Sequence, residues 1–179
     1  MILLCVAAGT VSLADAIGER KFGPDDVNTT VDMEAGKATI VSFTKLGVVD
    51  LLTISFALSD TSEGSTDNAT IENYLVNGTP TAVPVEKTAA AKINIKGDPR
   101  YSKFITVTPN IMLSTAGAEF EKVQPFEVDD SRYYFLFALR DGCEECSIVG
   151  YARIAFDFDK DGKFKEATLI KLMKTRQRL

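Results

Sequence analysis

Apolar side chains recur at every second position of residues 52–58, Leu-Thr-Ile-Ser-Phe-Ala-Leu. A β-strand places alternate side chains on one face, so this rhythm predicts a strand that is buried on one side. Weaker strands are predicted where β-branched and aromatic residues cluster between turn-forming residues, at 38–44, 91–96, 103–108 and 119–128.

The C-terminal third has the strongest pattern. Residues 133–139 are apolar at every position, which is typical of a central strand that is covered on both faces. Two more strands are predicted at 148–158 and 164–172. The dipeptides Asp141-Gly142 and Asp161-Gly162 precede them as turns, because glycine accepts the positive φ that a tight turn requires. The three strands together predict an antiparallel meander.

One short helix is predicted after Asp67, whose side chain can cap a helix N-terminus. Ile71, Tyr74 and Leu75 would then form one apolar stripe, and Gly78 would end the helix.

The predicted fold is mainly β: an antiparallel β-sandwich with a C-terminal three-stranded meander and one short helix. The alternative is an α+β fold in which a curved antiparallel sheet packs against a helix. A chain of 179 residues can bury one core, so residues 37–179 are expected to form a single β-rich domain. Residues 17–36 are polar and acidic and form a lead-in to it.

The first sixteen residues predict a cleavable secretory signal. Residues 2–14 carry no charge, and Ala14-Asp15-Ala16 has the small-x-small pattern of a cleavage site. The run is too short to span a membrane, so no integral membrane segment is expected in the mature chain. The usual basic residue after Met1 is missing, and a buried first strand or helix of a cytosolic domain is the alternative. We expect a secreted or periplasmic protein.

Charge and composition exclude several functions. The net charge is −5, and the four basic residues of 171–179 leave 16 basic and 25 acidic residues elsewhere, so nucleic acid is an unfavourable partner. The chain contains no histidine, and therefore cannot build a Ser-His-Asp or Cys-His centre from its own residues. Neither GxxxxGK[ST] nor GxGxxG occurs. No catalytic residue is assigned.

Cys143 and Cys146 flank Glu144 and Glu145 and are the two cysteines left after signal cleavage. In an oxidising compartment they are expected to form a structural disulfide that closes a hairpin loop. Thiol exchange is the alternative, although neighbouring carboxylates disfavour a reactive thiolate. A zinc site would need two further ligands, and neither a second CxxC nor a histidine supplies them.

Asp157, Asp159 and Asp161 begin a D-x-D-x-D-G pattern that could hold Ca²⁺ weakly. Position 12 of such a loop is Thr168 instead of a bidentate glutamate, and the flanks alternate as strands. The alternative interpretation places Asp157 and Asp159 on the solvent face of a strand and makes Asp161-Gly162 a hairpin turn. No other cofactor is predicted.

Three Asn-x-Thr triplets begin at Asn28, Asn68 and Asn77, and would be glycosylation sites in a eukaryotic secretory pathway. Two adjacent carboxylate pairs, Asp129-Asp130 and Glu144-Glu145, are the candidates for hydrolase chemistry. The aromatic residues at 133–137 could line a ligand pocket, but at strand spacing they more often form core.

These observations favour an exported, non-catalytic binding domain. It would recognise a protein, a glycan or a small apolar ligand, with polar loops at 59–66 and 78–90 available for contact. The alternative function is thiol–disulfide exchange by Cys143 and Cys146, and a carboxylate-based hydrolase is the weaker third hypothesis.

Overall fold

A computed structural model describes residues 38–57, 69–77 and 82–175. The predicted signal peptide and the lead-in lie outside the described residues, as does the loop predicted at 59–66. The described residues form nine strands: β1 Ala38–Thr44, β2 Asp50–Ala57, β3 Ala69–Val76, β4 Val83–Pro84, β5 Ile111–Leu113, β6 Glu119–Phe126, β7 Asp130–Asp141, β8 Ile148–Phe158 and β9 Phe164–Lys174. They also form the helices α3 Val85–Lys92 and α4 Ser102–Val107 and the 3₁₀ turn η2 Pro99–Tyr101.

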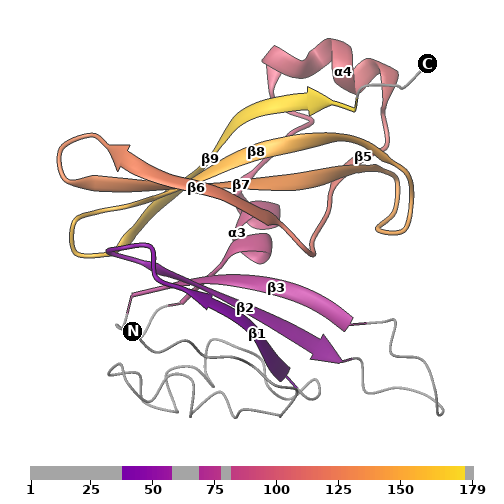
Figure 1. Cartoon of the computed structure of the whole chain (residues 1–179). Helices are drawn as coiled ribbons and strands as arrows, with labels where there is room; N and C mark the ends of the chain where they lie inside the picture. The colour runs from indigo at the N-terminus through magenta and orange to yellow at the C-terminus, as the bar shows by residue number, and fades with distance from the viewer. Residues whose placement is uncertain (1–37, 58–68, 78–81, 176–179) are drawn as a thin grey trace.

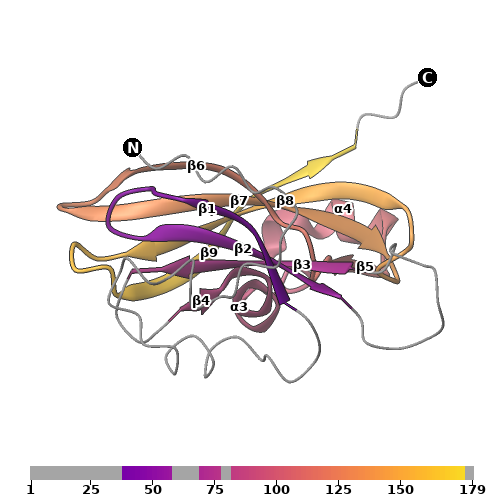
Figure 2. The same ribbon diagram turned by 60° about the horizontal axis from the view of Figure 1, so that its bottom comes forward.

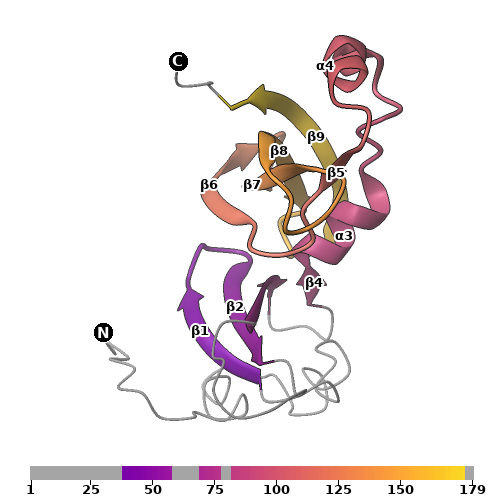
Figure 3. The same cartoon turned by 90° about the vertical axis from the view of Figure 1, so that its right-hand side faces the viewer.

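The strands form two antiparallel sheets. Sheet A has the order β1–β2–β3–β4, and sheet B has the order β5–β7–β8–β9, with β6 also paired to β7. Figure 1 shows sheet B above sheet A, with α3 beside the space between them and α4 at the far end of sheet B. Figure 2 shows the strands of the two sheets running in broadly similar directions. Sheet B curls, and β1 and α3 lie on opposite sides of the molecule (Figure 3).

The main hydrophobic core lies between the two sheets. Leu51 and Leu75 of sheet A belong to the same buried cluster as Phe135 and Phe156 of sheet B. A hydrogen-bonded contact also joins sheet B to the β1–β2 loop, because the hydroxyl of Tyr133 accepts from the backbone N–H of Val49 and donates to its carbonyl oxygen (3.1 and 3.2 Å). The fold is thus mainly β, as predicted, with two antiparallel sheets, one of them curled, and a short helix.

The C-terminal meander is confirmed. β7, β8 and β9 pair in sequence order, and Gly142 and Gly162 both have positive φ in the hairpin loops (93° and 77°). β7 was predicted to be covered by protein layers on both faces, but no described strand or helix layer covers its outer face. Long charged side chains cover it instead: the Lys122 ammonium lies 5.1 Å from the centre of the buried Tyr134 ring.

The helix predicted after Asp67 is wrong. Residues 69–76 form β3, which pairs with β2 along its whole length and with β4 at Tyr74 and Leu75. The spacing of Ile71, Tyr74 and Leu75 fits a helical stripe, but Tyr74, Leu75 and Val76 are all buried. A continuous short apolar run is equally typical of a strand that is covered on both faces, and the partner strands decide between the two.

The strands predicted at 91–96 and 103–108 are also wrong. The helix α3 occupies residues 85–92, part of the segment predicted as a polar loop at 78–90, and its sequence Val-Glu-Lys-Thr-Ala-Ala-Ala-Lys is rich in helix-forming residues. Residues 102–107 form α4, which continues the 3₁₀ turn at Pro99. The Asp98 side chain accepts a hydrogen bond from the Arg100 N–H (2.9 Å) and so caps that turn.

Candidate functional site

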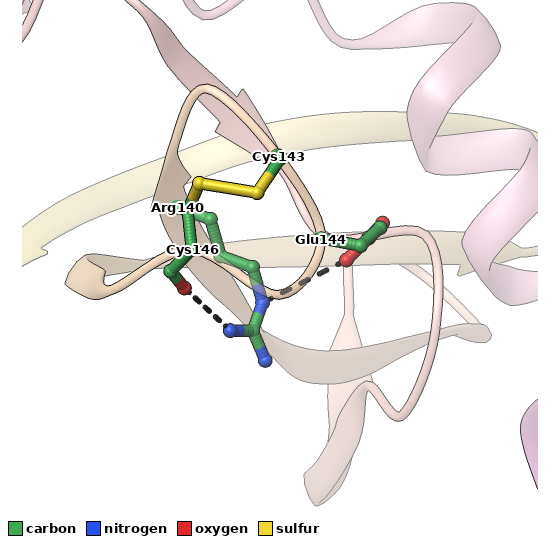
Figure 4. Close-up of a disulfide and its surroundings, with 4 residues drawn as sticks. All are labelled: Arg140, Cys143, Glu144 and Cys146. Carbon is green, nitrogen blue, oxygen red and sulfur yellow. Dashed lines mark hydrogen bonds and ion pairs between the residues drawn. A yellow bond between two sulfur atoms is a disulfide. The ribbon is translucent and has the colours of Figure 1, made fainter. Parts of the chain in front are cut away.

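The loop between β7 and β8 contains the predicted disulfide. The sulfur atoms of Cys143 and Cys146 lie 2.28 Å apart (Figure 4). The Cys146 N–H also donates to the Cys143 carbonyl oxygen at 3.1 Å. The bond closes a ring of four residues at the end of the hairpin. Glu144, inside this ring, points away from the disulfide toward the segment that follows β5 (Figure 4).

Glu144 fastens the disulfide loop to that neighbouring segment. Its Oε1 accepts from the backbone N–H of Thr115 (2.5 Å) and from the Thr115 hydroxyl (2.7 Å), and its Oε2 accepts from Ser114 Oγ (2.8 Å). Burial by itself raises the pKa of this carboxyl, but the donors of Thr115 and Ser114, with the charge of Arg140, outweigh it and hold the pKa below its usual value. The carboxylate is therefore ionised and connects two loops about thirty residues apart in sequence.

Arg140 supports the ring from the end of β7. Its Nη1 donates to the Cys146 carbonyl oxygen at 2.7 Å, and its Nε lies 3.7 Å from Glu144 Oε2 (Figure 4). Both contacts are to oxygen, so this guanidinium is engaged by groups other than the sulfur atoms. The arrangement favours a structural role for the disulfide, and thiol exchange stays a hypothesis.

The three aspartates of the possible calcium loop are not brought together. Asp157 lies on the outward face of β8 as predicted, yet it is only 1 % exposed, because Arg132 covers it with two hydrogen bonds of 2.6 Å. The Arg132 guanidinium in turn lies 3.3 Å from the centre of the Phe126 ring. The expectation of a solvated Asp157 is therefore wrong, since a cross-strand arginine replaces the water.

Asp159 and Asp161 belong to the β8–β9 turn. Asp159 Oδ1 accepts from the backbone N–H groups of Asp161 (3.0 Å) and Lys163 (2.9 Å), and these bonds, Lys163's first, lower the pKa of Asp159. Asp161 pairs with Lys160 at 2.8 Å. In the described ranges no group of three or more His, Cys, Asp or Glu side chains is placed to hold a metal ion, and the weak calcium site stays a prediction.

Asn77 is the predicted glycosylation site that the structure describes; Asn28 and Asn68 lie outside the described residues. The Asn77 side-chain amide nitrogen donates to the carbonyl oxygen of Gly162 in the β8–β9 hairpin. This nitrogen is the atom to which a glycan would be attached, so modification of the folded chain would first require the side chain to rotate away. Glycosylation itself stays a prediction.

The carboxylate pairs proposed for a hydrolase lie at the ends of hairpins. Asp130, the first residue of β7 and the neighbour of Asp129, binds Lys165 at 2.6 Å. Glu144 lies in the β7–β8 loop and accepts from Thr115.

Tyr133, Phe135 and Phe137 pack in the core. The ring of Tyr133 contacts Phe158 edge to face, and that of Phe135 contacts Phe120 in the same way, with centroids 5.4 Å apart in each pair.

One buried carboxylate, Glu86 on α3, was not predicted from the sequence. Its Oε2 accepts from the Asn73 N–H (2.9 Å), and its Oε1 accepts from Asn73 Nδ2 (2.7 Å) and the Ala118 N–H (3.2 Å). Burial raises the pKa of Glu86 by more than these bonds lower it. The residue joins α3, sheet A and the start of β6, and its bonds to amide groups indicate a structural role.

The edges of the sheets are protected unequally. The described edge strands β6 and β9 carry several charges, and β6 also contains Pro125. Two others are short: β4 has two residues and ends at Pro84, and the uncharged β5 has three. The β9 backbone is also capped, because Leu169 O accepts from Arg100 Nη2 at 3.1 Å. Charges, proline, short length, β-bulges and covering groups are the usual means by which proteins prevent edge pairing.

β1 has none of these charge or proline protections. Its sequence, Ala-Thr-Ile-Val-Ser-Phe-Thr, is uncharged, residues 41–45 are all exposed, and Val41 and Phe43 are 49 % and 41 % exposed. Among the described strands, only β2 pairs with it. A register shift between Ile40 and Ser42 makes Val41 the extra residue of a β-bulge. The sequence predicted this strand but not its position at an edge.

Sheet A also has an apolar outer face, on the side away from sheet B. We define it as the cluster of Leu52, Ile54, Tyr74 and Val76, with Ile40 and Phe56 packed against it. Of the described residues, only those of sheet A and the adjoining Ala82 contribute to this cluster. Phe43 pairs with Leu52 and so extends the face to the β1 edge.

Within the described part of the chain, no helix is both long and apolar enough to cross a membrane. No protein-family model, curated protein or solved structure gives a significant match to this chain.

Proposed function

We propose that this chain is an exported, non-catalytic binding domain that recognises an extended segment of another protein by adding it as a strand to the edge of β1. The observation that carries the proposal is the contrast between β1 and the other sheet edges. β6 and β9 bear charges, and β4 and β5 are only two and three residues long. β1 instead offers seven uncharged residues, with Val41 and Phe43 exposed.

Strand addition supplies both affinity and selectivity. Backbone hydrogen bonds to β1 hold the added segment, and alternate side chains distinguish one segment from another. On the outer face the added strand lies next to Phe43 and Ile40, and on the inner face it lies next to Ser42, which pairs with Thr53. The bulge at Val41 increases the local twist and so narrows the range of segments that fit.

Export is part of the proposal and rests on sequence and chemistry. The uncharged residues 2–14 with Ala14-Asp15-Ala16 support a signal peptide, and a structural disulfide is typical of oxidising compartments. Of the three ligand classes expected from sequence, an open strand edge favours protein over a glycan or a small apolar ligand.

The test selects ten-residue peptides from a displayed library on the purified chain and measures their affinity by fluorescence polarisation. Val41→Lys places a charge on the β1 edge and is expected to weaken the selected peptides about tenfold, because a cross-strand contact is worth ~0.2–1 kcal/mol and the lysine adds a desolvation cost. Val107→Lys, at a 76 % exposed position on α4, is the matched control. Equal affinity for both variants contradicts the proposal.

A variant without the disulfide provides a second test, which separates peptide binding from thiol exchange. Peptide binding at β1 does not use the Cys143–Cys146 bond, so it should persist in the Cys143→Ala/Cys146→Ala variant. A selected ligand that instead becomes covalently attached through Cys143 or Cys146 would favour the thiol-exchange alternative.

A further inference from the structure

A row of polar side chains crosses the inner face of sheet A and ends at the edge of β1 that no described strand occupies. The row consists of Asn73 on β3, Thr53 on β2 and Ser42 on β1, which are paired neighbours in the register of the three strands. We propose that this row decides which segments β1 accepts: a bound segment has a hydrogen-bond donor, Ser, Thr or Asn, opposite Ser42, between two apolar residues. This inference rests on the proposed function, since it specifies the ligand of the same edge.

The hydrogen bonds of the row run inward, away from β1. Glu86 Oε1 accepts from Asn73 Nδ2 at 2.7 Å, and the Ala118 carbonyl oxygen accepts from the same nitrogen at 2.8 Å. Both protons of the Asn73 amide are thus used, and its Oδ1 accepts from Thr53 Oγ1 at 2.9 Å. Because a hydroxyl has one proton, Thr53 can only accept a bond from the β1 side. With a strand added, Ser42 donates to Thr53 and accepts from the side chain opposite it.

Burial decreases along the row and leaves its last member open to solvent. Asn73 is 4 % exposed, Thr53 is half-buried and Ser42 is exposed. A strand added to β1 removes solvent from the Ser42 hydroxyl, and a buried hydroxyl without a partner is costly. An apolar residue opposite Ser42 carries that cost, whereas a donor replaces the lost solvent contact. The row therefore selects against segments that are apolar at this position.

The two flanking positions have the opposite preference. On the outer face, Phe43 ends a row that continues with Leu52 and Tyr74. Leu52 and Tyr74 are 3 % and 0 % exposed, but Phe43 is 41 % exposed, so an apolar residue on the added strand would complete its burial. Ile40 ends the next row of this face, on the other side of Ser42 along β1.

The strand that already pairs with β1 has this same pattern. Residues 52–54 of β2, Leu-Thr-Ile, lie opposite Phe43, Ser42 and Ile40. An antiparallel segment on the other edge meets the same two faces of sheet A, because side chains alternate between the faces in every strand. In the register of β2, its sequence is therefore apolar, donor, apolar. Figure 3 shows β1 on the side of the molecule opposite α3, where the added strand would lie.

The experiment compares three forms of the full chain against the displayed ten-residue library: the native chain, Ser42→Val and Thr44→Val. We expect the native chain to enrich Ser, Thr or Asn between two apolar residues, and Ser42→Val to enrich Val or Ile at that position. Valine favours strands and position 42 is exposed, so this variant should keep its fold, which far-ultraviolet circular dichroism checks. Thr44→Val is the matched control, because Thr44 is also exposed but belongs to the row of Leu51 and Leu75.

Affinities of synthetic peptides make the comparison quantitative. Replacing the donor of a selected peptide by Val should weaken its binding to the native chain about threefold, the effect of one cross-strand pair, and should not weaken its binding to Ser42→Val. If the peptides depend on Val41 but Ser42→Val prefers the same residue as the native chain, the inference is overturned and the proposed function stands. The same holds if Thr44→Val changes the preference equally. If no selected peptide depends on Val41, both are overturned.

Discussion

The four-residue disulfide ring and Glu144 should stabilise the protein as one unit. Glu144 lies inside the ring that Cys143 and Cys146 close, and it reaches its partners on Thr115 and Ser114 from there. Removing the disulfide by Cys143→Ala/Cys146→Ala therefore does more than free a loop. It also releases the backbone that aims the Glu144 carboxylate at the neighbouring turn.

The magnitudes follow from the loop length and the hydrogen bonds. Closing a loop of four residues is worth about 2 kcal/mol in the chain-entropy treatment. Glu144 accepts three hydrogen bonds and lies near Arg140, but its side chain is 37 % exposed, so Glu144→Ala should cost only about 1–2 kcal/mol. If the ring positions Glu144, that cost should fall by about 1 kcal/mol in the protein without the disulfide.

A double-mutant cycle tests this coupling. Urea unfolding is followed by far-ultraviolet circular dichroism, because the chain has no tryptophan to report by fluorescence. Glu145→Ala, an exposed neighbour in the same ring, is the control and should show no coupling to the disulfide. Costs of the disulfide and Glu144 changes that add to within about 0.5 kcal/mol would refute the reasoning and show that the two stabilise the protein independently.

Two further predictions concern other parts of the fold. Gly162→Ala should lower the free energy of unfolding by about 1–3 kcal/mol, because φ is +77° and the new Cβ would lie 2.5 Å from Asn77 Nδ2. Gly117→Ala is the control, since φ is +67° there but no atom lies within 4 Å of the new Cβ. It should cost clearly less in the same denaturant unfolding experiment. The raised pKa of Glu86 means that its contribution to stability is fully present below the unfolded value of about 4.5 and is lost as pH rises through the folded pKa. The stability of the native protein minus that of Glu86→Gln should therefore fall with increasing pH, and a flat difference would contradict the raised pKa.

The local alternation of apolar and polar residues was sufficient to predict much of the sheet structure. The alternation in 148–158 and the glycine of each hairpin turn depend on neighbouring residues only, and the strand β8 has the predicted bounds. The errors arose where short segments satisfied two patterns. Residues 69–76 and 103–107 each fit a strand or a helix locally, and pairing with β2 and continuation of the η2 turn decided their structures.

Side-chain partners that are distant in sequence were not predictable in the same way. Asp157 was expected in water because its position alternates with Phe156 and Phe158, and that face assignment is correct. Its burial depends on Arg132, a residue 25 positions earlier, whose location follows only from the register of β7 on β8. Glu86 is a similar case, since a glutamate in an alanine-rich helix normally faces solvent.

The same reasoning explains why the proposed function depends on an edge and not on a motif. An uncharged strand such as β1 is ordinary when both of its edges are paired, and it indicates a binding surface only when one edge is open. Sequence shows the absence of charge, and topology shows that β2 is its only described partner. Among the described edge strands, β6 and β9 carry charges and β4 and β5 are short, so the seven uncharged residues of β1 are the contrast that supports the proposed strand addition.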